Sequence, residues 1–195
     1  MLRLPYAWTH SLGPILVCVI TTMLFIAEPT SSMWLAFDRE SIGQGEWWRL
    51  LTGNFLHANL NHLLLNLAAV VLLWTLHGQY YQTLHYLMMI CICGIAVSIG
   101  IYYLDPQLQW YVGLSGVLHG IFVWGAYQDI KHGLVSGWIL MAGVWAKIAN
   151  EQIAGASNSV AVLIDANVAI NAHLFGAFFG LVMIICALIK QQKNS

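Results

Sequence analysis

Long apolar runs constrain the fold of this chain more than any other feature. A helix needs ~20 residues to cross the hydrocarbon layer of a bilayer, and six runs approach that length between polar or helix-breaking residues. They span residues 11–27, 61–76, 84–104, 113–128, 134–149 and 168–189. Only 8% of the 195 residues are charged, against ~25% in soluble domains. The sequence therefore predicts an all-α membrane protein, a six-helix transmembrane bundle forming a single domain over residues 1–195.

The distribution of basic residues predicts how this bundle is oriented. Six crossings place both termini on one side, together with a group of basic residues: Arg3, Lys131, Lys190 and Lys193. The loop of residues 29–59 carries Arg39 and Arg49 on the other side. Because basic residues favour the cytoplasmic side, we expect cytoplasmic termini. The same loop is rich in tryptophan, which indicates a segment lying at headgroup depth.

Charge and cysteine usage exclude several function classes. The net charge of -1, with scattered basic residues, offers no phosphate-binding patch, so we expect no nucleic-acid partner. No Asp or Glu lies in the middle of a predicted helix, which disfavours proton-relay transporters and aspartyl proteases. The four cysteines lie in apolar runs without a Cys-x-x-Cys pair, so we expect free thiols and no structural zinc.

A serine and a histidine are predicted to meet at the outer side of the membrane. Ser115 opens the fourth predicted helix, and His173 lies near the start of the sixth. The parity of the crossings puts both at the same level. Small residues that favour close helix packing accompany them: Gly116 and Gly120 in one helix, and Ala172, Gly176 and Gly180 in the other. Close packing would bring the hydroxyl within hydrogen-bond reach of the imidazole, as a base-activated nucleophile requires.

Further polar residues could support this pair. His62 and Asn66 are four residues apart on one helix face. With the backbone N–H of Ser115, they could donate to an oxyanion. His119 lies one turn after Ser115 and could stack on or hydrogen-bond with His173. No membrane carboxylate is available to orient His173, so the sequence predicts a dyad and not a triad.

Two other interpretations stay open at this point. Gly-x-Ser-Gly can be a packing motif, in which case the chain would bind membrane clients without catalysis. Alternatively, the histidines could bind haem or a metal in a six-helix membrane protein; the candidates are His57, His62, His119 and His173. The catalytic interpretation predicts neither a metal nor another cofactor.

These residues, in this order, resemble the rhomboid family of intramembrane serine proteases. The resemblance covers almost the whole chain and rests on these residues: Trp48, Arg49, His57, His62, Asn66, Gly113, Ser115, Gly116, Ala172, His173, Gly176 and Gly180. It implies that Ser115 is the nucleophile, His173 its base, and His62 and Asn66 the oxyanion side chains. Gly116 and His57 would support the site. Many rhomboids carry Tyr at the position of His119, where its ring packs on the catalytic histidine; the resemblance implies this stacking role for His119 with altered electrostatics.

The segment Gly113–Gly120 is most similar to the rhombosortase branch of bacterial rhomboids. That resemblance implies substrates with a C-terminal sorting tail, made of a glycine-rich motif, a hydrophobic helix and a basic end. The expected partners are therefore membrane-anchored proteins and lipid. It also implies a bacterial inner-membrane enzyme whose active site faces the periplasm. The acyl-enzyme would pass its product to water or to an amine, and the fifth helix or residues 151–165 would admit the substrate.

Overall fold

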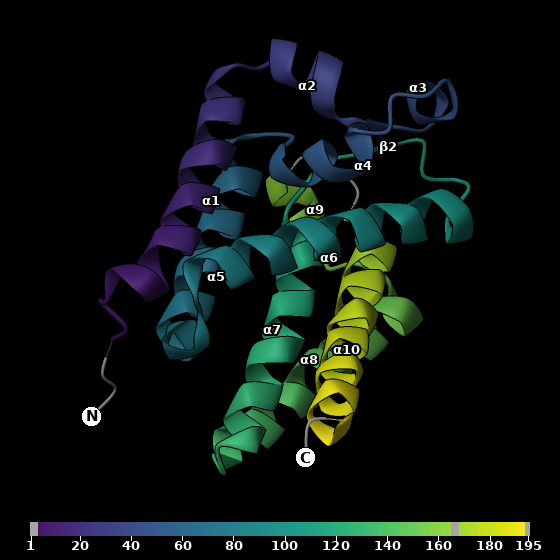
Figure 1. Ribbon diagram of the computed structural model, residues 1–195. Helices are drawn as coiled ribbons and strands as arrows, with labels where there is room; N and C mark the ends of the chain where they lie inside the picture. Colours follow the sequence, from purple (N-terminus) through teal and green to yellow (C-terminus); the bar gives the residue numbers. More distant parts are fainter. Residues whose placement is uncertain (1–3, 165–167, 194–195) are drawn as a thin grey trace.

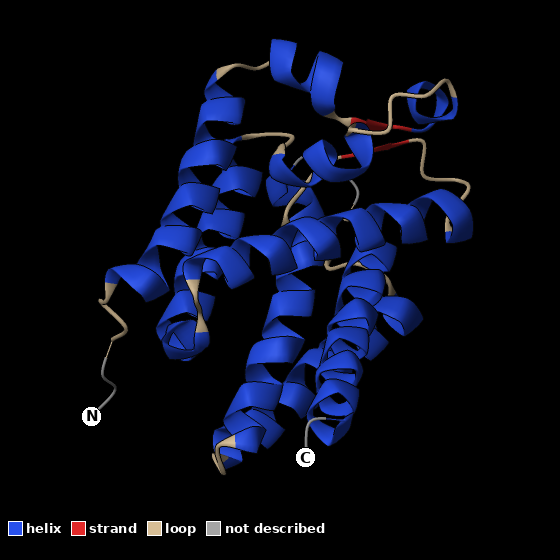
Figure 2. Cartoon of the chain, in the orientation of Figure 1, coloured by secondary structure: helices blue, strands red, loops and turns tan. Residues whose placement is uncertain are grey.

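The computed structural model describes residues 4–164 and 168–193, and it is predominantly helical (Figure 1, Figure 2). Of the segment expected to admit substrate, residue 165 lies outside the described ranges. The elements in chain order are α1 (Trp8–Ile26), α2 (Thr30–Leu35), β1 (Phe37–Asp38), α3 (Arg39–Gly43), α4 (Arg49–Thr52), η1 (Gly53–Phe55), α5 (Leu60–His77), η2 (Gly78–Tyr80), α6 (Thr83–Leu104), β2 (Trp110–Tyr111), α7 (Ser115–Lys131), α8 (Val135–Ala154), α9 (Asn158–Ile164) and α10 (Ile170–Lys193). Each of the six predicted runs coincides with most of one long helix.

Helix α8 departs furthest from its predicted range. It was expected to end at residue 149, but it continues to Ala154. Glu151 was assigned to the following polar loop, whereas it lies on the last turn of the helix and pairs with Lys147 four residues earlier. Gly155 caps the end of the helix, and its positive φ of 83° suits a residue without a side chain.

Helix α7 is the centre of the bundle. It contacts α5, α6, α8 and α10, and most of its side chains between Gly116 and Ala126 are buried. Among the described residues, four helices are long and apolar enough to cross a membrane, namely α1, α5 with η2, α6 and α10. Helix α7 is less apolar than these because it is largely surrounded by protein, where polar groups can find partners.

Helices α7 and α10 pack with their backbones almost in contact (Figure 1). A Cβ atom added to Gly176 would lie 1.8 Å from the carbonyl oxygen of Gly116, and one added to Gly180 would lie 2.7 Å from that of Gly120. A Cβ on Gly116 would in turn lie 2.9 Å from the carbonyl oxygen of Ala172. The prediction that these small residues form facing ridges is therefore confirmed.

The segment between α1 and α5 is folded into short elements at one end of the bundle (Figure 1). Strand β1 pairs antiparallel with β2, with Phe37 opposite Tyr111 and Asp38 opposite Trp110. The guanidinium of Arg49 pairs with Glu46 and donates to the backbone oxygens of Met33 and Ala36. Arginine here holds the segment together and is itself buried.

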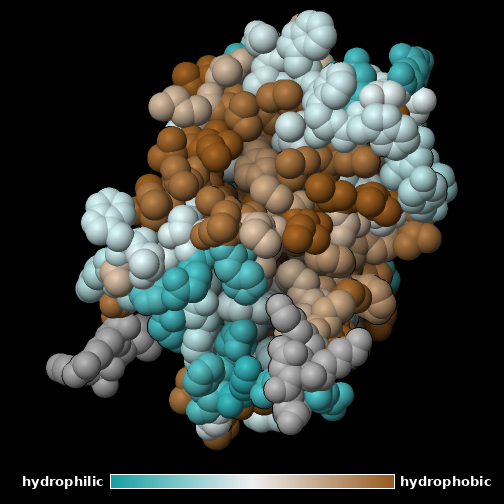
Figure 3. Space-filling model, in the orientation of Figure 1, coloured by the Kyte–Doolittle hydropathy of each residue, from teal (hydrophilic) through white to brown (hydrophobic). Residues whose placement is uncertain are grey.

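The surface divides into zones along the bundle. Figure 3 shows an apolar zone on the visible face, between a paler upper end and a more hydrophilic lower part. Three tryptophans of the segment between α1 and α5 are exposed, namely Trp34, Trp47 and Trp48. In Figure 1 the start of α1, at the left, and the end of α10, at the bottom, both lie below that segment.

Candidate active site

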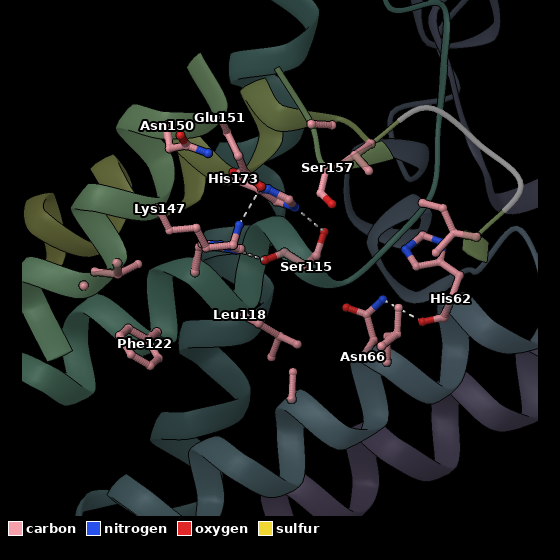
Figure 4. Close-up of a pocket in the computed structure, with 18 of the residues that line it drawn as sticks. His62, Asn66, Ser115, Leu118, Phe122, Lys147, Asn150, Glu151, Ser157 and His173 are labelled. Carbon is pink, nitrogen blue, oxygen red and sulfur yellow. Dashed lines mark hydrogen bonds and ion pairs between the residues drawn. The ribbon is translucent and has the colours of Figure 1, made fainter. Parts of the chain in front are cut away.

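Ser115 is the first residue of α7, and its hydroxyl meets an imidazole from α10. The distance between Ser115 Oγ and His173 Nε2 is 2.9 Å, and Figure 4 shows the two side chains pointing toward each other. The close approach of α7 and α10 at their glycines makes this contact possible, since each residue lies beside its ridge. The expected hydrogen bond between hydroxyl and imidazole is therefore present.

The other ring nitrogen of His173 contacts a carboxylate, which corrects the expectation of a dyad. His173 Nδ1 lies 2.9 Å from Glu151 Oε2. The second carboxylate oxygen of Glu151 accepts a hydrogen bond of 2.6 Å from Lys147 Nζ. The prediction that no membrane carboxylate could orient His173 is wrong, because α8 extends one turn beyond the apolar run from which its end was predicted. That turn carries Glu151 to the level of the active-site pair.

His119 lies against the face of the His173 ring. The two ring centroids are 4.2 Å apart with an interplanar angle of 20°, so the predicted stacking is confirmed. Nδ1 of His119 is 2.7 Å from the backbone oxygen of Ser115, one helical turn earlier. Since a carbonyl can only accept, this nitrogen donates. The bond fixes the His119 ring beneath that of His173.

Two residues of α5 face the pair from across a cavity. His62 and Asn66 lie opposite Ser115 and His173 in Figure 4, and all four line the same space. The amide nitrogen of Asn66 donates to the backbone oxygen of His62 over 3.0 Å, which leaves its second N–H. Nδ1 of His62 accepts from the backbone N–H of Ala58 over 3.5 Å. Its Nε2 is then the protonated nitrogen and a donor.

Gly113 explains why the loop before α7 can pass close to His62. A Cβ atom on Gly113 would lie 2.8 Å from Cε1 and 2.9 Å from Nε2 of the His62 ring, and φ there is +133°. Glycine alone adopts this conformation without strain. The carbonyl of Gly113 accepts a hydrogen bond of 2.6 Å from the Tyr111 hydroxyl. The backbone before Ser115 is thereby fixed beside the His62 ring.

His57 precedes α5 and lies beneath His62. It is 1% exposed, and its ring meets that of His62 edge to face with centroids 5.1 Å apart. Neither ring nitrogen has a hydrogen-bond partner among the described residues. Burial, together with the neighbouring His62, lowers the pKa of His57 to about 3. His57 therefore supports the His62 ring as a neutral side chain and does not reach Ser115.

The polar residues open into a cavity of about 740 Å³ between α5 and α8. Its walls are mainly apolar and include Leu65, Leu72 and Val144. A second cavity of about 250 Å³ also reaches Ser115, and its lining includes Trp110 and Ile164. Ser115 and His62 line both spaces. An extended peptide that passes the hydroxyl could thus occupy both spaces.

The structure separates the four histidines of the metal or haem interpretation. Among the described residues, the one group close enough to share an ion is His119, Glu151 and His173, with ligand atoms within 4.8 Å. The rings of His119 and His173 are stacked and nearly parallel, so their in-plane lone pairs do not converge on one point. His57 and His62 do not belong to that group. The arrangement suits proton transfer between Ser115 and His173 better than metal coordination.

A hydroxyl held by an imidazole inside a helical membrane bundle is the arrangement of an intramembrane serine hydrolase, and comparison with known proteins specifies the family. The Rhomboid domain family matches residues 44–190. YdcA of Bacillus subtilis (strain 168) is 27% identical over 179 residues, which cover 88% of this chain and 85% of YdcA. GlpG of Salmonella newport (strain SL254) and of Salmonella typhimurium are each 28% identical over 197 aligned positions, covering 98% of this chain.

The chain therefore belongs to the rhomboid family. YdcA and GlpG are both named as rhomboid proteases, and the class they define is that of rhomboid-type serine proteases. The chain spans 66% of the length of GlpG. The Rhomboid domain match, over residues 44–190, spans the site from His57 to His173.

Proposed function

We propose that this protein is an intramembrane serine endopeptidase in which Ser115 is the nucleophile and His173 the general base. The observation that carries the proposal is the 2.9 Å contact between Ser115 Oγ and His173 Nε2 within the cavity between α5 and α8. A serine hydroxyl is a weak nucleophile unless an adjacent base accepts its proton. In this bundle the contact joins two residues that are 58 positions apart in sequence, and the glycine ridges of α7 and α10 bring them together.

The reaction follows from these positions. Ser115 Oγ forms a bond to the carbonyl carbon of the substrate while its proton passes to His173 Nε2. The tetrahedral intermediate then collapses, the C–N bond breaks, and the leaving amine takes the proton from Nε2. The acyl group remains on Ser115 as an ester. Water, or a second amine, attacks this ester while His173 again accepts the proton; the bond between the acyl carbon and Oγ then breaks, and Nε2 returns the proton to Ser115 Oγ.

The negative oxygen of the intermediate would be held by three donors. They are the backbone N–H of Ser115, Nε2 of His62 and the second amide N–H of Asn66. Preorganised donors of this kind are each worth roughly 3 kcal/mol in the transition state. Gly113 allows the first two to approach each other, because its missing side chain leaves room for the His62 ring.

We further propose that all six long helices cross the inner membrane of a bacterium, with both termini in the cytoplasm. The start of α1 and the end of α10 both lie on the side of the bundle away from the segment between α1 and α5, and Ser115, the first residue of α7, lies at the end of α7 that is nearer to that segment. Arg39 and Arg49 stand on the periplasmic side in this orientation, but both are bound to backbone oxygens of the fold. Their structural use removes the main objection from the positive-inside rule.

The proposed substrates are membrane-anchored proteins with a C-terminal sorting tail. The resemblance of residues 113–120 to rhombosortases supports this choice. The apolar walls of the larger cavity, from α5 and α8, suit the hydrophobic helix of such a tail. The glycine-rich motif ahead of that helix would be the part able to extend past Ser115, because glycine weakens helical structure.

The first test is labelling of the purified protein by a fluorophosphonate probe, which reacts only with an activated serine. We expect labelling of the wild type and its loss in both Ser115→Ala and His173→Ala. Ser136→Ala is the matched control, since Ser136 is an exposed serine outside the site. An unlabelled wild type, or undiminished labelling of Ser115→Ala, would contradict the proposal.

The substrate is tested with a reporter protein that carries a sorting tail. Co-expression with the wild type should release the reporter from the membrane, and co-expression with Ser115→Ala should not. A second reporter, whose glycine-rich motif is replaced by alanine and leucine, should remain anchored. Equal release of both reporters would refute the glycine-rich motif as the recognised feature while leaving the serine mechanism intact.

A further inference from the structure

A carboxylate stands behind the proposed base. Glu151 lies on the last turn of α8, and its Oε2 is 2.9 Å from His173 Nδ1. Nε2 of the same ring is 2.9 Å from Ser115 Oγ. The side chains of Glu151 and His173 are only 12% and 7% exposed, so water competes weakly for these bonds. Ser115, His173 and Glu151 thus form one line of contacts across α7, α10 and α8 (Figure 4).

We propose that Glu151 is a positioning residue for His173, which makes the site a Ser-His-Glu triad; the inference rests on the proposed function. An ionised carboxylate can only accept hydrogen bonds. Its contact with Nδ1 therefore requires the proton of the neutral ring to be on Nδ1. The lone pair of Nε2 is then directed at the Ser115 hydroxyl, as a general base requires. The carboxylate also lies beside the imidazolium that forms during acylation.

The other neighbours of His173 cannot supply this. His119 from α7 stacks on the ring and fixes its plane, but its own Nδ1 is engaged by the Ser115 backbone oxygen. His62 from α5 lies across the cavity. Lys147 is a cation, and it contacts the second oxygen of Glu151 at 2.6 Å. Stacking leaves the ring free to flip within its plane, whereas the carboxylate selects one orientation and one tautomer.

The position of Glu151 on α8 is itself well defined. The ion pair with Lys147 joins residues four apart on one helix, which directs the carboxylate toward the cavity side. Both oxygens are used, one by Lys147 and one by His173. Helix α8 also forms a wall of the larger cavity. Glu151, which orients the base His173, is therefore carried by a helix that lines the cavity proposed to receive the substrate.

The test measures fluorophosphonate labelling of Ser115 in the full-length protein, as a maximal rate constant and a half-saturating probe concentration. We expect Glu151→Gln to lower the maximal rate at least about 100-fold at unchanged half-saturation, because loss of the orienting carboxylate in serine proteases lowers turnover about 10⁴-fold. Glu151→Asp keeps the charge on a shorter side chain, and its maximal labelling rate should be about tenfold below that of the wild type. Glu40→Gln, on the exposed surface of α3, is the control.

The outcomes separate this inference from the proposed function. If the wild type is labelled at Ser115 but Glu151→Gln reaches the same maximal rate, the triad is refuted and the serine mechanism stands. Equal losses in the Gln and Asp variants would also overturn it, because the side chain would then act through its shape. If the Gln variant loses its cooperative unfolding transition, Glu151→Asp decides, and an unchanged maximal rate would be the refuting result.

Discussion

Replacing Gly176 by Ala should move helix α10, which carries His173, away from helix α7, which carries Ser115. A Cβ atom at this position would lie 1.8 Å from the carbonyl oxygen of Gly116, and Cβ atoms essentially never approach another atom closer than 3.0 Å. The backbones of α7 and α10 must therefore move apart by at least about 1.2 Å, the difference between these two distances. No rotamer can relieve the clash, because both atoms belong to rigid helices.

The displacement acts on the Ser115–His173 contact, which lies one turn away. If it fell entirely along that 2.9 Å contact, the atoms would be about 4.1 Å apart and the hydrogen bond would be lost. Misplacement of about 1 Å lowers rates by about 100-fold, and overpacking lowers the free energy of unfolding by about 1–3 kcal/mol.

Fluorophosphonate labelling gives the rate, and thermal unfolding in detergent gives the stability. Gly43→Ala is the control, since Gly43 lies on the exposed helix α3 and its Cβ would be 3.6 Å from the nearest atom. A Gly176→Ala variant that is labelled within twofold of the wild-type rate would refute the reasoning that close helix packing builds the site.

Three further predictions concern the surrounding structure and are measured by unfolding in detergent. His57 is neutral in the folded protein down to pH about 3, whereas the unfolded state takes up a proton below about 6.5. The contribution of His57 to the free energy of unfolding is thus present above pH 6.5, and below that pH it is lost at up to about 1.4 kcal/mol per pH unit. His57→Gln should remove this part of the pH dependence. An unchanged dependence of the free energy of unfolding on pH would contradict the prediction. Arg39→Met should lower stability by about 2 kcal/mol, because the guanidinium donates to four backbone oxygens near the end of α6; an unaltered unfolding midpoint would contradict this. Asn59→Ala should cost about 1 kcal/mol more than Asn61→Ala, since both donate to the end of α9 but Asn59 alone also caps α5; equal losses would refute the cap.

The long helices and the meeting of Ser115 with His173 could be predicted because each depends on local patterns. Apolar length determined the helices, and the parity of crossings determined the level of both residues. The glycine spacing then determined which helices approach. Helix length and glycine spacing can be recognised from residues that are close together in sequence. The parity argument required only the number of crossings.

Glu151 could not be found in the same way. A polar residue at the end of an apolar run reads as the beginning of a loop, and its partner His173 is 22 residues away on another helix. The available signal was local: Lys147 and Glu151 are four residues apart, which favours a continuing helix. The short elements between α1 and α5 were missed for a related reason. Their stability comes from distant backbone oxygens bound by Arg39 and Arg49, not from a helical pattern of their own.

The pairing of β1 with β2 gives the nucleophile a second attachment. Strand β2 ends at Tyr111, four residues before Ser115, and its partner β1 belongs to the segment that carries the exposed tryptophans. Gly113 is tied to the same segment through the backbone oxygen of Gly53. The sequence predicts these tryptophans at headgroup depth, and in that placement the height of Ser115 would be set relative to the lipid headgroups as well as to its own helix. A thinner or thicker bilayer would strain this linkage directly, so hydrophobic thickness is expected to tune the reactivity of the serine.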